Sequence, residues 1–287
     1  MPVQLLGAGE IRALAAELDV TPTKKLGQNF VVDANTVRKI VHVADVRPGE
    51  RVVEIGPGLG SLTLAILEAG ASVTAVEIDV RLAARLPGTA TAHGVADGAL
   101  QVVAADALRV SDLPGRPTVL VANLPYNVSV PVLLHFLETF PELQRGVVMV
   151  QAEVGERLAA PPGSKVYGAP SAKAAWYGPW RLAGTVSRQV FWPVPNVDSV
   201  LVAFTRDASP RGTDRERLRT FAIVDAAFRQ RRKMLRQALA DVLGGSSSSA
   251  SAVLEHAGVR ATARGEELSI DDFQRIAAVA GGDLPVR

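Results

Sequence analysis

Short apolar runs alternate with amphipathic segments along the first half of the chain. An apolar run bounded by turn residues predicts a buried strand, and apolar spacings of three and four predict a helix. The runs predicted as strands are 51–55, 73–77, 101–105, 118–122 and 146–151. The segments predicted as helices are 11–18, 34–44, 61–69, 80–86, 130–140 and 153–159. This alternation indicates an α/β fold, with a doubly wound, Rossmann-like parallel sheet between two layers of helices.

The pattern changes in the second half of the chain. Residues 180–191 and 198–205 are predicted to form a closing pair of strands. The stretch 207–212 is rich in Pro, Gly and Ser, which is typical of a linker. The helices predicted beyond it are 215–243, 250–257 and 270–280, with a flexible tract at 244–249. We therefore expect a larger domain over residues 1–206 and a small helical domain over residues 207–287.

Composition narrows the chemistry. The chain has 287 residues, of which 48% are hydrophobic, so it can bury a large core. It has no cysteine, which excludes disulfides, thiolate metal sites, iron–sulfur clusters and cysteine nucleophiles. The four histidines are scattered, and no metal is expected. No apolar run could span a bilayer and no secretory signal is present, so we expect a cytoplasmic protein without a membrane partner.

A glycine-rich turn follows the first strand of the alternation. Residues 54–60 read Glu-Ile-Gly-Pro-Gly-Leu-Gly, and glycines at such a turn let the backbone approach a ligand closely. Glu77 ends the next strand, where a carboxylate could accept both hydroxyls of a ribose. Asp106 ends the third strand and could bond an adenine amino group, while Ile78 could pack on the adenine face.

Dinucleotide sites and S-adenosylmethionine sites share this layout. Pro57 disfavours the compact turn that binds a pyrophosphate, and Glu54 places an anion beside the turn. An anion repels a pyrophosphate but suits a ligand that carries an ammonium and a sulfonium group. The pattern therefore favours S-adenosylmethionine as the cofactor, with a dinucleotide as the alternative.

The loop Asn123-Leu124-Pro125-Tyr126 lies between the fourth strand and a helix. The Asn123 side-chain oxygen and the Leu124 carbonyl could accept the two N–H bonds of an exocyclic amine and localise its lone pair. Pro125 would fix the backbone, and Tyr126 would offer a flat face to a flipped base. An ordinary strand-to-helix turn is the alternative interpretation. Right-handed crossovers with strand order 3-2-1-4-5 would place this loop beside the glycine-rich turn.

Basic residues are concentrated in the C-terminal segment. Arg229, Arg232, Lys233 and Arg236 would share one face of the predicted helix over 215–243. Such a face suits the phosphates of a folded RNA, although a basic helical face is more often simply solvated. The predicted RNA-binding residues are Lys24, Lys25, Arg229, Arg231, Arg232, Lys233 and Arg236.

Seven parts of the sequence occur in the order of a known set of motifs. They are 25–30, 54–60, 77–79, Asp106, 123–127, 191–199 and 230–233. Together they resemble the motifs of the KsgA-type small-subunit ribosomal RNA adenine dimethyltransferase family, over nearly the whole chain. Val31 departs from the family, which usually has Leu there, although a backbone contact would survive this change.

The resemblance implies N6,N6-dimethylation of two adjacent adenosines near the 3′ end of 16S rRNA, in the 30S particle. It implies a methyltransferase domain with a basic N-terminal extension and a C-terminal RNA-binding domain, in a chain that we expect to be a monomer. From the motifs and the resemblance together, the predicted cofactor-binding residues are Gln28, Asn29, Val31, Glu54, Gly56, Gly58, Glu77, Ile78, Asp106, Ala107 and Asn123. The predicted catalytic residues are Asn123, Leu124, Pro125, Tyr126 and Phe191.

We expect direct in-line methyl transfer, driven by orientation and without a metal or a nucleophilic residue. Tyr126 and Phe191 would stack on the two faces of the flipped base, with core packing as the alternative for Phe191.

Other functions remain possible. An Erm-type 23S rRNA methyltransferase usually has Ile where this chain has Leu124, and a DNA adenine methyltransferase usually has Asp in place of Asn123. A non-catalytic checkpoint on pre-30S particles could coexist with methylation. A nicotinamide-dependent oxidoreductase would need hydride-handling residues, which we do not find.

Overall fold

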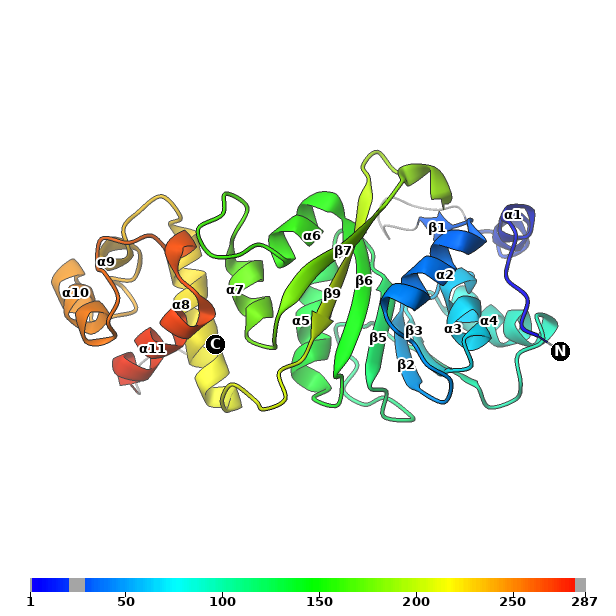
Figure 1. Cartoon of the computed structure of the whole chain (residues 1–287), viewed down its shortest axis with the longest axis horizontal. Coiled ribbons are helices and arrows are strands. Elements are labelled where there is room, and N and C mark those ends of the chain that lie inside the picture. Colours follow the sequence, from blue (N-terminus) through cyan, green and yellow to red (C-terminus); the bar gives the residue numbers. More distant parts are fainter. Residues whose placement is uncertain (1, 21–28, 282–287) are drawn as a thin grey trace. The chain divides into compact units, whose positions relative to one another are not determined.

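The computed structural model describes residues 2–20 and 29–281. It contains a seven-stranded sheet with the order β4-β3-β2-β5-β6-β9-β7 (Figure 1). The strands are β2 Arg51–Ile55, β3 Ser72–Glu77, β4 Leu100–Ala104, β5 Val119–Asn123, β6 Arg145–Gln151, β7 Trp180–Val186 and β9 Ser199–Thr205. The first five are parallel, and β9 pairs antiparallel to β6. The expected order 3-2-1-4-5 is confirmed, and the closing strands extend the sheet beyond β6.

Helices connect the parallel strands, as the alternation predicts. The helices are α1 Ala8–Glu17, α2 Ala34–Val43, α3 Ser61–Glu68, α4 Val80–Ala92, α5 Ser129–Thr139, α6 Ala152–Leu158, α7 Ala169–Ala175, α8 Asp214–Arg229, α9 Leu235–Ala238, α10 Ser247–His256 and α11 Ile270–Ala280. Two further strands, β1 Phe30–Val31 and β8 Phe191–Trp192, form a small antiparallel sheet. Among the described residues, no helix is both long and apolar enough to cross a bilayer.

Apolar side chains from helices and strands form the core of the sheet domain. One cluster packs Ile40 of α2 and Ile66 of α3 against Val52 and Val121 of the central strands. These four side chains are fully buried, which contributes about 1.5–3 kcal/mol for each to the free energy of folding.

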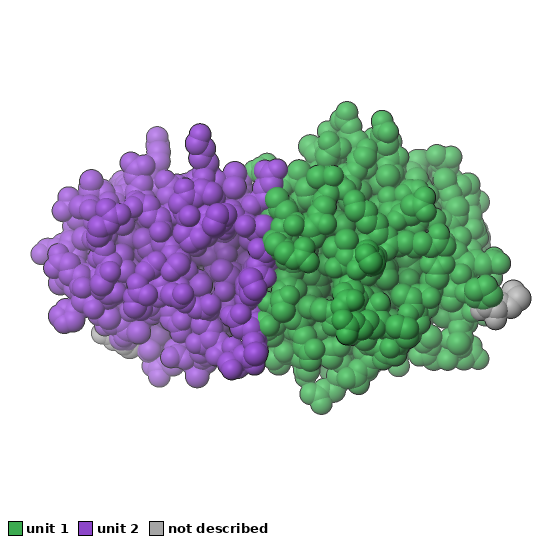
Figure 2. Space-filling view, in the orientation of Figure 1, with its two compact units in different colours: residues 1–155, 181–206 green, residues 156–180, 207–287 purple. Residues whose placement is uncertain are grey.

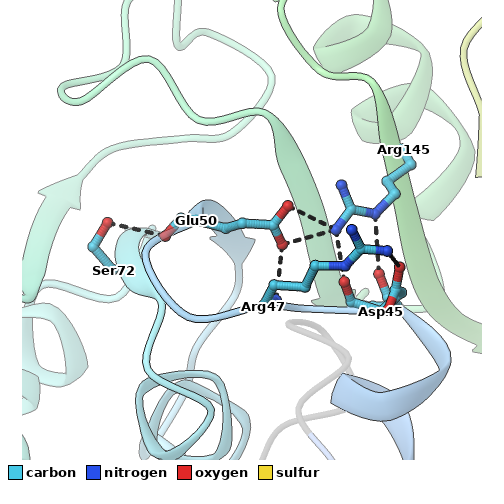
Figure 3. A network of polar contacts seen from close by, with 6 residues as sticks. Asp45, Arg47, Glu50, Ser72 and Arg145 are labelled. Carbon is cyan, nitrogen blue, oxygen red and sulfur yellow. Dashed lines mark hydrogen bonds and ion pairs between the residues drawn. The ribbon is translucent and has the colours of Figure 1, made fainter.

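A polar network lies at the end of the sheet where the parallel strands begin. Arg145, the first residue of β6, donates from Nη2 to both carboxylate oxygens of Glu50 at 3.0 and 2.8 Å and to the Asp45 carbonyl at 2.7 Å (Figure 3). The Glu50 carbonyl accepts from the Ser72 backbone N–H at 2.8 Å, where β3 begins. Burial opposes ionisation of Glu50, but the bonds from Arg145 and the Arg47 backbone N–H lower its pKa overall. The network joins β2, β3 and β6 at the end away from their carboxyl termini.

The chain divides into two compact units, coloured separately in Figure 2. Unit 1 comprises residues 1–155 and 181–206, and unit 2 comprises residues 156–180 and 207–287. The predicted boundary near residue 206 coincides with a boundary between the units. The sequence did not indicate that 156–180 packs with the C-terminal helices. In this segment the Tyr167 hydroxyl donates to the Leu268 carbonyl at 2.9 Å, and Lys173 pairs with Asp225 of α8 at 2.7 Å.

The predicted single helix over 215–243 is wrong, because α8 ends at Arg229 and α9 begins only at Leu235. The backbone N–H of Leu235 donates to the Ala263 carbonyl at 2.8 Å, and that of Arg236 donates to the Ala261 carbonyl at 3.1 Å. Leu235 is fully buried. These tertiary bonds and this burial replace the local bonds of a continuous helix.

Two smaller predictions are also corrected. The helix predicted over 80–86 continues to Ala92, with Pro87 inside it, because the added turn buries Thr89 and Ala90. The tract predicted as flexible over 244–249 forms a turn and the first residues of α10: Gly244 and Gly245 turn the chain with φ of +90° and +80°. The side chain of the next residue, Ser246, then caps α10 by accepting from the Ser249 backbone N–H.

Candidate active site

A cavity of about 260 Å³ opens at the carboxyl ends of β2, β3, β4 and β5, which is room for a small organic ligand rather than for a few waters. The predicted site residues that line it are Asn29, Val31, Glu54, Gly56, Gly58, Glu77, Ile78, Asp106, Ala107, Asn123, Leu124, Pro125 and Tyr126. Gln28 lies outside the described residues. The two loops singled out in the sequence therefore meet in one crevice, as the strand order requires.

The glycines of the glycine-rich turn allow neighbouring groups to approach its backbone closely. Gly58 has φ of +59°, and a Cβ there would lie 2.9 Å from Cε1 of Phe30. Gly56 has φ of +69°, and a Cβ there would lie 3.8 Å from the Asn123 carbonyl oxygen. Both positions favour glycine by conformation, and Gly58 also requires it by space. The short distance from Gly56 to Asn123 shows how near the two loops lie to each other.

Glu77 orders the turn from the next strand. One carboxylate oxygen accepts from the Gly58 backbone N–H at 3.0 Å, and the other accepts from the Asp79 backbone N–H at 2.9 Å. A carboxylate has about four acceptor positions, so these two bonds leave capacity for hydroxyl groups of a ligand. Burial raises the pKa of Glu77, although these backbone bonds oppose the rise.

Exposed apolar side chains mark the neighbouring part of the cavity. Ile78 is 57% exposed and Leu108 is 39% exposed, and both line the cavity. A side-chain oxygen of Asp106 accepts from the Leu108 backbone N–H at 2.9 Å, which holds the turn after β4. Sequence reasoning found Ile78 and Asp106 but missed Leu108, because a single Leu after a strand carries no distinctive signal.

Glu54 differs from its expected state. The side chain is buried, and the Thr63 hydroxyl donates to it at 2.6 Å. Burial raises the pKa of Glu54 to about 8, so the carboxyl is mainly protonated at neutral pH in this structure. The anion expected from the sequence is therefore not the favoured form of Glu54 in the ligand-free protein. A positively charged group placed beside it would favour the ionised form and lower the pKa.

The loop after β5 is held at three points. The Asn123 amide nitrogen donates to the Asn29 carbonyl at 3.1 Å, which leaves the amide oxygen as the acceptor end of the side chain. The Leu124 backbone N–H donates to the Met149 carbonyl of β6 at 3.1 Å. The Tyr126 hydroxyl and the Ser199 hydroxyl share a hydrogen bond of 2.8 Å. The loop is therefore a fixed structure whose polar acceptors lie beside the glycine-rich turn.

The model of the family called ribosomal RNA adenine dimethylase matches residues 21–280, nearly the whole chain. The chain belongs to this family. It is thus an S-adenosylmethionine-dependent rRNA adenine dimethyltransferase, which decides against a dinucleotide as the ligand of the glycine-rich turn. The cavity fits S-adenosylmethionine. The glycines place no side chain in it, Glu77 can accept further hydrogen bonds from ligand hydroxyls, and Ile78 offers an apolar surface to an adenine ring.

Curated relatives and solved structures agree with this membership. The chain is 67% identical to ribosomal RNA small subunit methyltransferase A of Leifsonia xyli subsp. xyli, over 96% of this chain and 99% of the relative. Its counterpart of that name in Streptomyces coelicolor is 59% identical, over 96% and 97%.

Among solved structures, the 23S rRNA methyltransferase ErmE is 26% identical with a TM-score of 0.66, over 88% of this chain and all of that one. A dimethyladenosine transferase from Plasmodium falciparum is 24% identical with a TM-score of 0.73, over 85% and 94%, and supports the fold alone.

Phe191 is not brought to the cavity. It is 1% exposed and belongs to the core cluster, because β8 pairs with β1 in a register that sets Phe191 opposite Val31. This corrects the expectation that Phe191 offers a second face to the base. Its neighbour Trp192 stacks on Phe30, with ring centroids 6.3 Å apart.

The predicted basic helical face is also not formed. Arg229 is the last residue of α8, whereas Arg232 and Lys233 lie exposed in the turn before α9, and Arg236 is half-buried in α9. Arg231 is engaged within unit 2, since its guanidinium pairs with Glu266 at 3.0 Å. Lys24 and Lys25 lie outside the described residues. The basic residues around 229–236 thus form a turn-centred group and not one face of a helix.

Within the described part of the chain, no cluster of three or more His, Asp or Glu side chains has the arrangement of a metal site.

Proposed function

We propose that this chain transfers methyl groups from S-adenosylmethionine to the N6 amines of two adjacent adenosines near the 3′ end of 16S rRNA, within the 30S particle. One observation carries the proposal: the Asn123 loop and the glycine-rich turn share one cavity, with the Asn123 amide oriented by the Asn29 carbonyl. The relatives named as small-subunit methyltransferases support the choice of rRNA. The products would be N6,N6-dimethyladenosines, formed by a monomer in the cytoplasm during small-subunit biogenesis.

The cofactor would lie across the glycine-rich turn. Glu77 would accept from the ribose hydroxyls, and Asp106 would accept from the adenine amino group. Ile78 and Leu108, which are exposed and line the cavity, would pack on the adenine ring. Glu54 would lie near the positively charged end of the donor. The other expected contacts are with Gln28, Asn29, Val31, Gly56, Gly58 and Ala107.

The acceptor amine would be held by the loop after β5. S-adenosylmethionine supplies a methyl group on a positively charged sulfur, which is already a good leaving group. The Asn123 amide oxygen and the Leu124 carbonyl accept the two N–H bonds and orient the nitrogen lone pair toward the donor side of the cavity. The same oxygens stabilise the positive charge that develops on nitrogen, so they bind the transition state better than the planar amine.

Tyr126 would stack on the flipped base and offset part of the cost of unstacking it, by about 1–3 kcal/mol. Pro125 would hold the turn between the acceptors and this ring. No residue is needed as a base, because the methylated nitrogen is strongly acidic and can lose its proton to water.

Contact with RNA phosphates would come from unit 2. Arg229, Arg232 and Lys233 are exposed around the turn between α8 and α9, and Arg236 follows in α9. Arg231 would act mainly by holding this turn through Glu266. Lys24 and Lys25 are the other expected phosphate contacts.

The test is methylation of unmethylated 30S and 50S particles with a methyl-labelled donor, followed by mapping of the modified nucleotides. We expect label on two adjacent adenosines near the 3′ end of 16S rRNA and none in the 50S particle. Methylation of 23S rRNA alone would overturn the proposed substrate and favour an Erm-type activity. An Asn123→Ala variant in parallel controls for contaminating methyltransferases.

A further inference from the structure

We propose that Ser199 is a positioning residue for the methyl transfer, because its hydroxyl tethers the Tyr126 hydroxyl and so sets the plane on which the flipped base stacks. This inference rests on the proposed function, in which Tyr126 is the stacking face. Ser199 does not line the cavity, so it would act only through Tyr126. The two residues are 73 positions apart in sequence, and their hydroxyl oxygens lie 2.8 Å apart.

The Ser199 side chain is itself held in place. Ser199 is fully buried and begins β9, opposite Gln151 in the antiparallel ladder with β6. The preceding residue is fixed on both sides: the Asp198 carbonyl accepts from the Ala152 backbone N–H at 3.0 Å, and its carboxylate accepts from the Arg188 backbone N–H at 3.1 Å. A hydroxyl on such a rigid support is a fixed point for its partner.

The Tyr126 ring needs such a fixed point. A tyrosine side chain has two rotatable torsions, and the Tyr126 ring borders an open cavity, so packing alone holds it incompletely. Burial, partly offset by the bond to Ser199, raises the pKa of the phenol, so Tyr126 stays protonated at neutral pH and keeps its hydrogen for a bond. The bond to Ser199 therefore restricts both torsions at once.

Strand β6 provides a common frame for both parts of the acceptor site. The Met149 carbonyl of β6 accepts from the Leu124 backbone N–H, which fixes the amine-binding end of the loop. Two residues further along β6, Gln151 pairs with Ser199, which fixes the stacking end. The angle between the base plane and the amine acceptors is thus set by one strand. That angle decides whether the lone pair of the amine points along the line of methyl transfer.

The experiment is a double-mutant cycle on methylation of 30S particles, with Ser199→Ala, Tyr126→Phe and the double variant. Each single change removes the same hydrogen bond and keeps the ring, so we expect each to lower kcat by about five- to tenfold. The affinity for S-adenosylmethionine should stay unchanged. The double variant should be no slower than either single variant, because the second change has no bond left to remove.

A purely structural role for Ser199 predicts a different result. Ser199→Ala would then leave kcat at the wild-type value or lower it further in the Tyr126→Phe background, and either result overturns the proposal. Ser171→Ala is the matched control, since Ser171 is a buried serine of unit 2 whose hydroxyl bonds the Arg157 carbonyl. It should change the melting temperature without changing kcat. If Ser199→Ala does not fold, Tyr126→Phe tests the bond from the other side, and a wild-type kcat in that variant overturns the proposal.

Tyr126→Ala separates this proposal from the proposed function. We expect it to lower kcat more than Tyr126→Phe does, because it removes the ring as well as the bond. Full activity in Tyr126→Ala would refute the stacking role itself and the tether with it. Reduced activity in Tyr126→Ala together with an additive cycle would refute only the tether.

Discussion

The Glu54 carboxyl shows how burial sets the chemistry of a single residue in this site. Its pKa is raised from 4.5 to about 8, chiefly by desolvation, with the Thr63 bond opposing the rise and the Glu77 charge adding to it. A proton is therefore held in the folded state over a pH range in which the unfolded state has released it. Folding stability must fall as pH rises from about 4.5 to 8, because the folded state binds more protons than the unfolded state there.

Glu54→Gln should remove this pH dependence. Between pH 6 and 7 the wild type should lose about 1.4 kcal/mol of unfolding free energy relative to the variant, because glutamine does not titrate, and the loss per pH unit should shrink as the pH approaches the folded-state pKa of about 8. Urea unfolding of the donor-free protein at pH 6, 7 and 8 measures the difference. Parallel pH profiles for the two proteins would show that Glu54 titrates normally.

Local chemistry decided which site residues could be predicted from the sequence. Glu77 and Asn123 are the last residues of β3 and β5. Ligand sites of such sheets lie at the carboxyl ends of the parallel strands, so the positions of both residues follow from the strand order. The hydrogen bond of Ser199 to Tyr126 depends on the register of β9 with β6, and the burial of Phe191 depends on the register of β8 with β1. Such registers join segments far apart in sequence, and no local pattern encodes them.

At the scale of elements, the close pairing of β5 and β6 depends on one glycine. A Cβ at Gly146 would lie 2.4 Å from the Leu120 carbonyl oxygen and 2.6 Å from Cε1 of Phe204. The carbonyl belongs to the neighbouring strand and cannot move without breaking the ladder. Gly88 provides a contrast, since it is exposed inside α4 and a Cβ there would meet nothing within 4 Å.

The two glycines should respond to alanine in opposite directions. Gly146→Ala should destabilise the protein by about 1–3 kcal/mol or more, through overpacking and a displaced strand. Gly88→Ala should stabilise it by about 0.5–1 kcal/mol, because alanine loses less backbone entropy on entering a helix. Denaturant unfolding of both variants against the wild type provides the comparison. A stable Gly146→Ala protein would refute the close approach of the two strands.

Elements were predictable where local pattern and tertiary structure agree. Five apolar runs became five parallel strands, and Asp33 caps α2 by accepting from the Thr36 backbone N–H at 2.7 Å. Helical periodicity alone could not reveal the end of α8, because the turn after Arg229 is stabilised by backbone bonds from Leu235 and Arg236 to residues more than 20 positions later.

At the scale of the whole molecule, we propose that unit 1 carries out catalysis and that unit 2 contacts the RNA phosphates. The net charge of +2 is small, so the local group of cations around the α8–α9 turn must provide the electrostatic attraction. Because binding releases counterions, the affinity for the 30S particle should fall as the salt concentration rises. The slope of log K against log salt concentration is proportional to the number of phosphates contacted.

Removal of two of these cations should weaken binding and flatten its salt dependence. The negative slope of log K against log salt concentration should become shallower by about one to two in an Arg232→Ala, Lys233→Ala double variant. Filter binding or sedimentation of 30S particles at several salt concentrations measures this slope. Arg116→Ala, which removes an exposed cation of unit 1 paired with Glu142, is the control. An unchanged slope in the double variant would remove the turn from the RNA-binding surface.

The central claim is that the Asn123 amide holds the acceptor amine opposite the donor, and that this placement drives the reaction. Single-turnover methylation of 30S particles by Asn123→Ala, with donor affinity measured by calorimetry, tests it most directly. The account predicts a loss of about 100-fold or more in the rate of methyl transfer, with the donor dissociation constant within about tenfold of wild type. A transfer rate within about tenfold of wild type at saturating donor would contradict it.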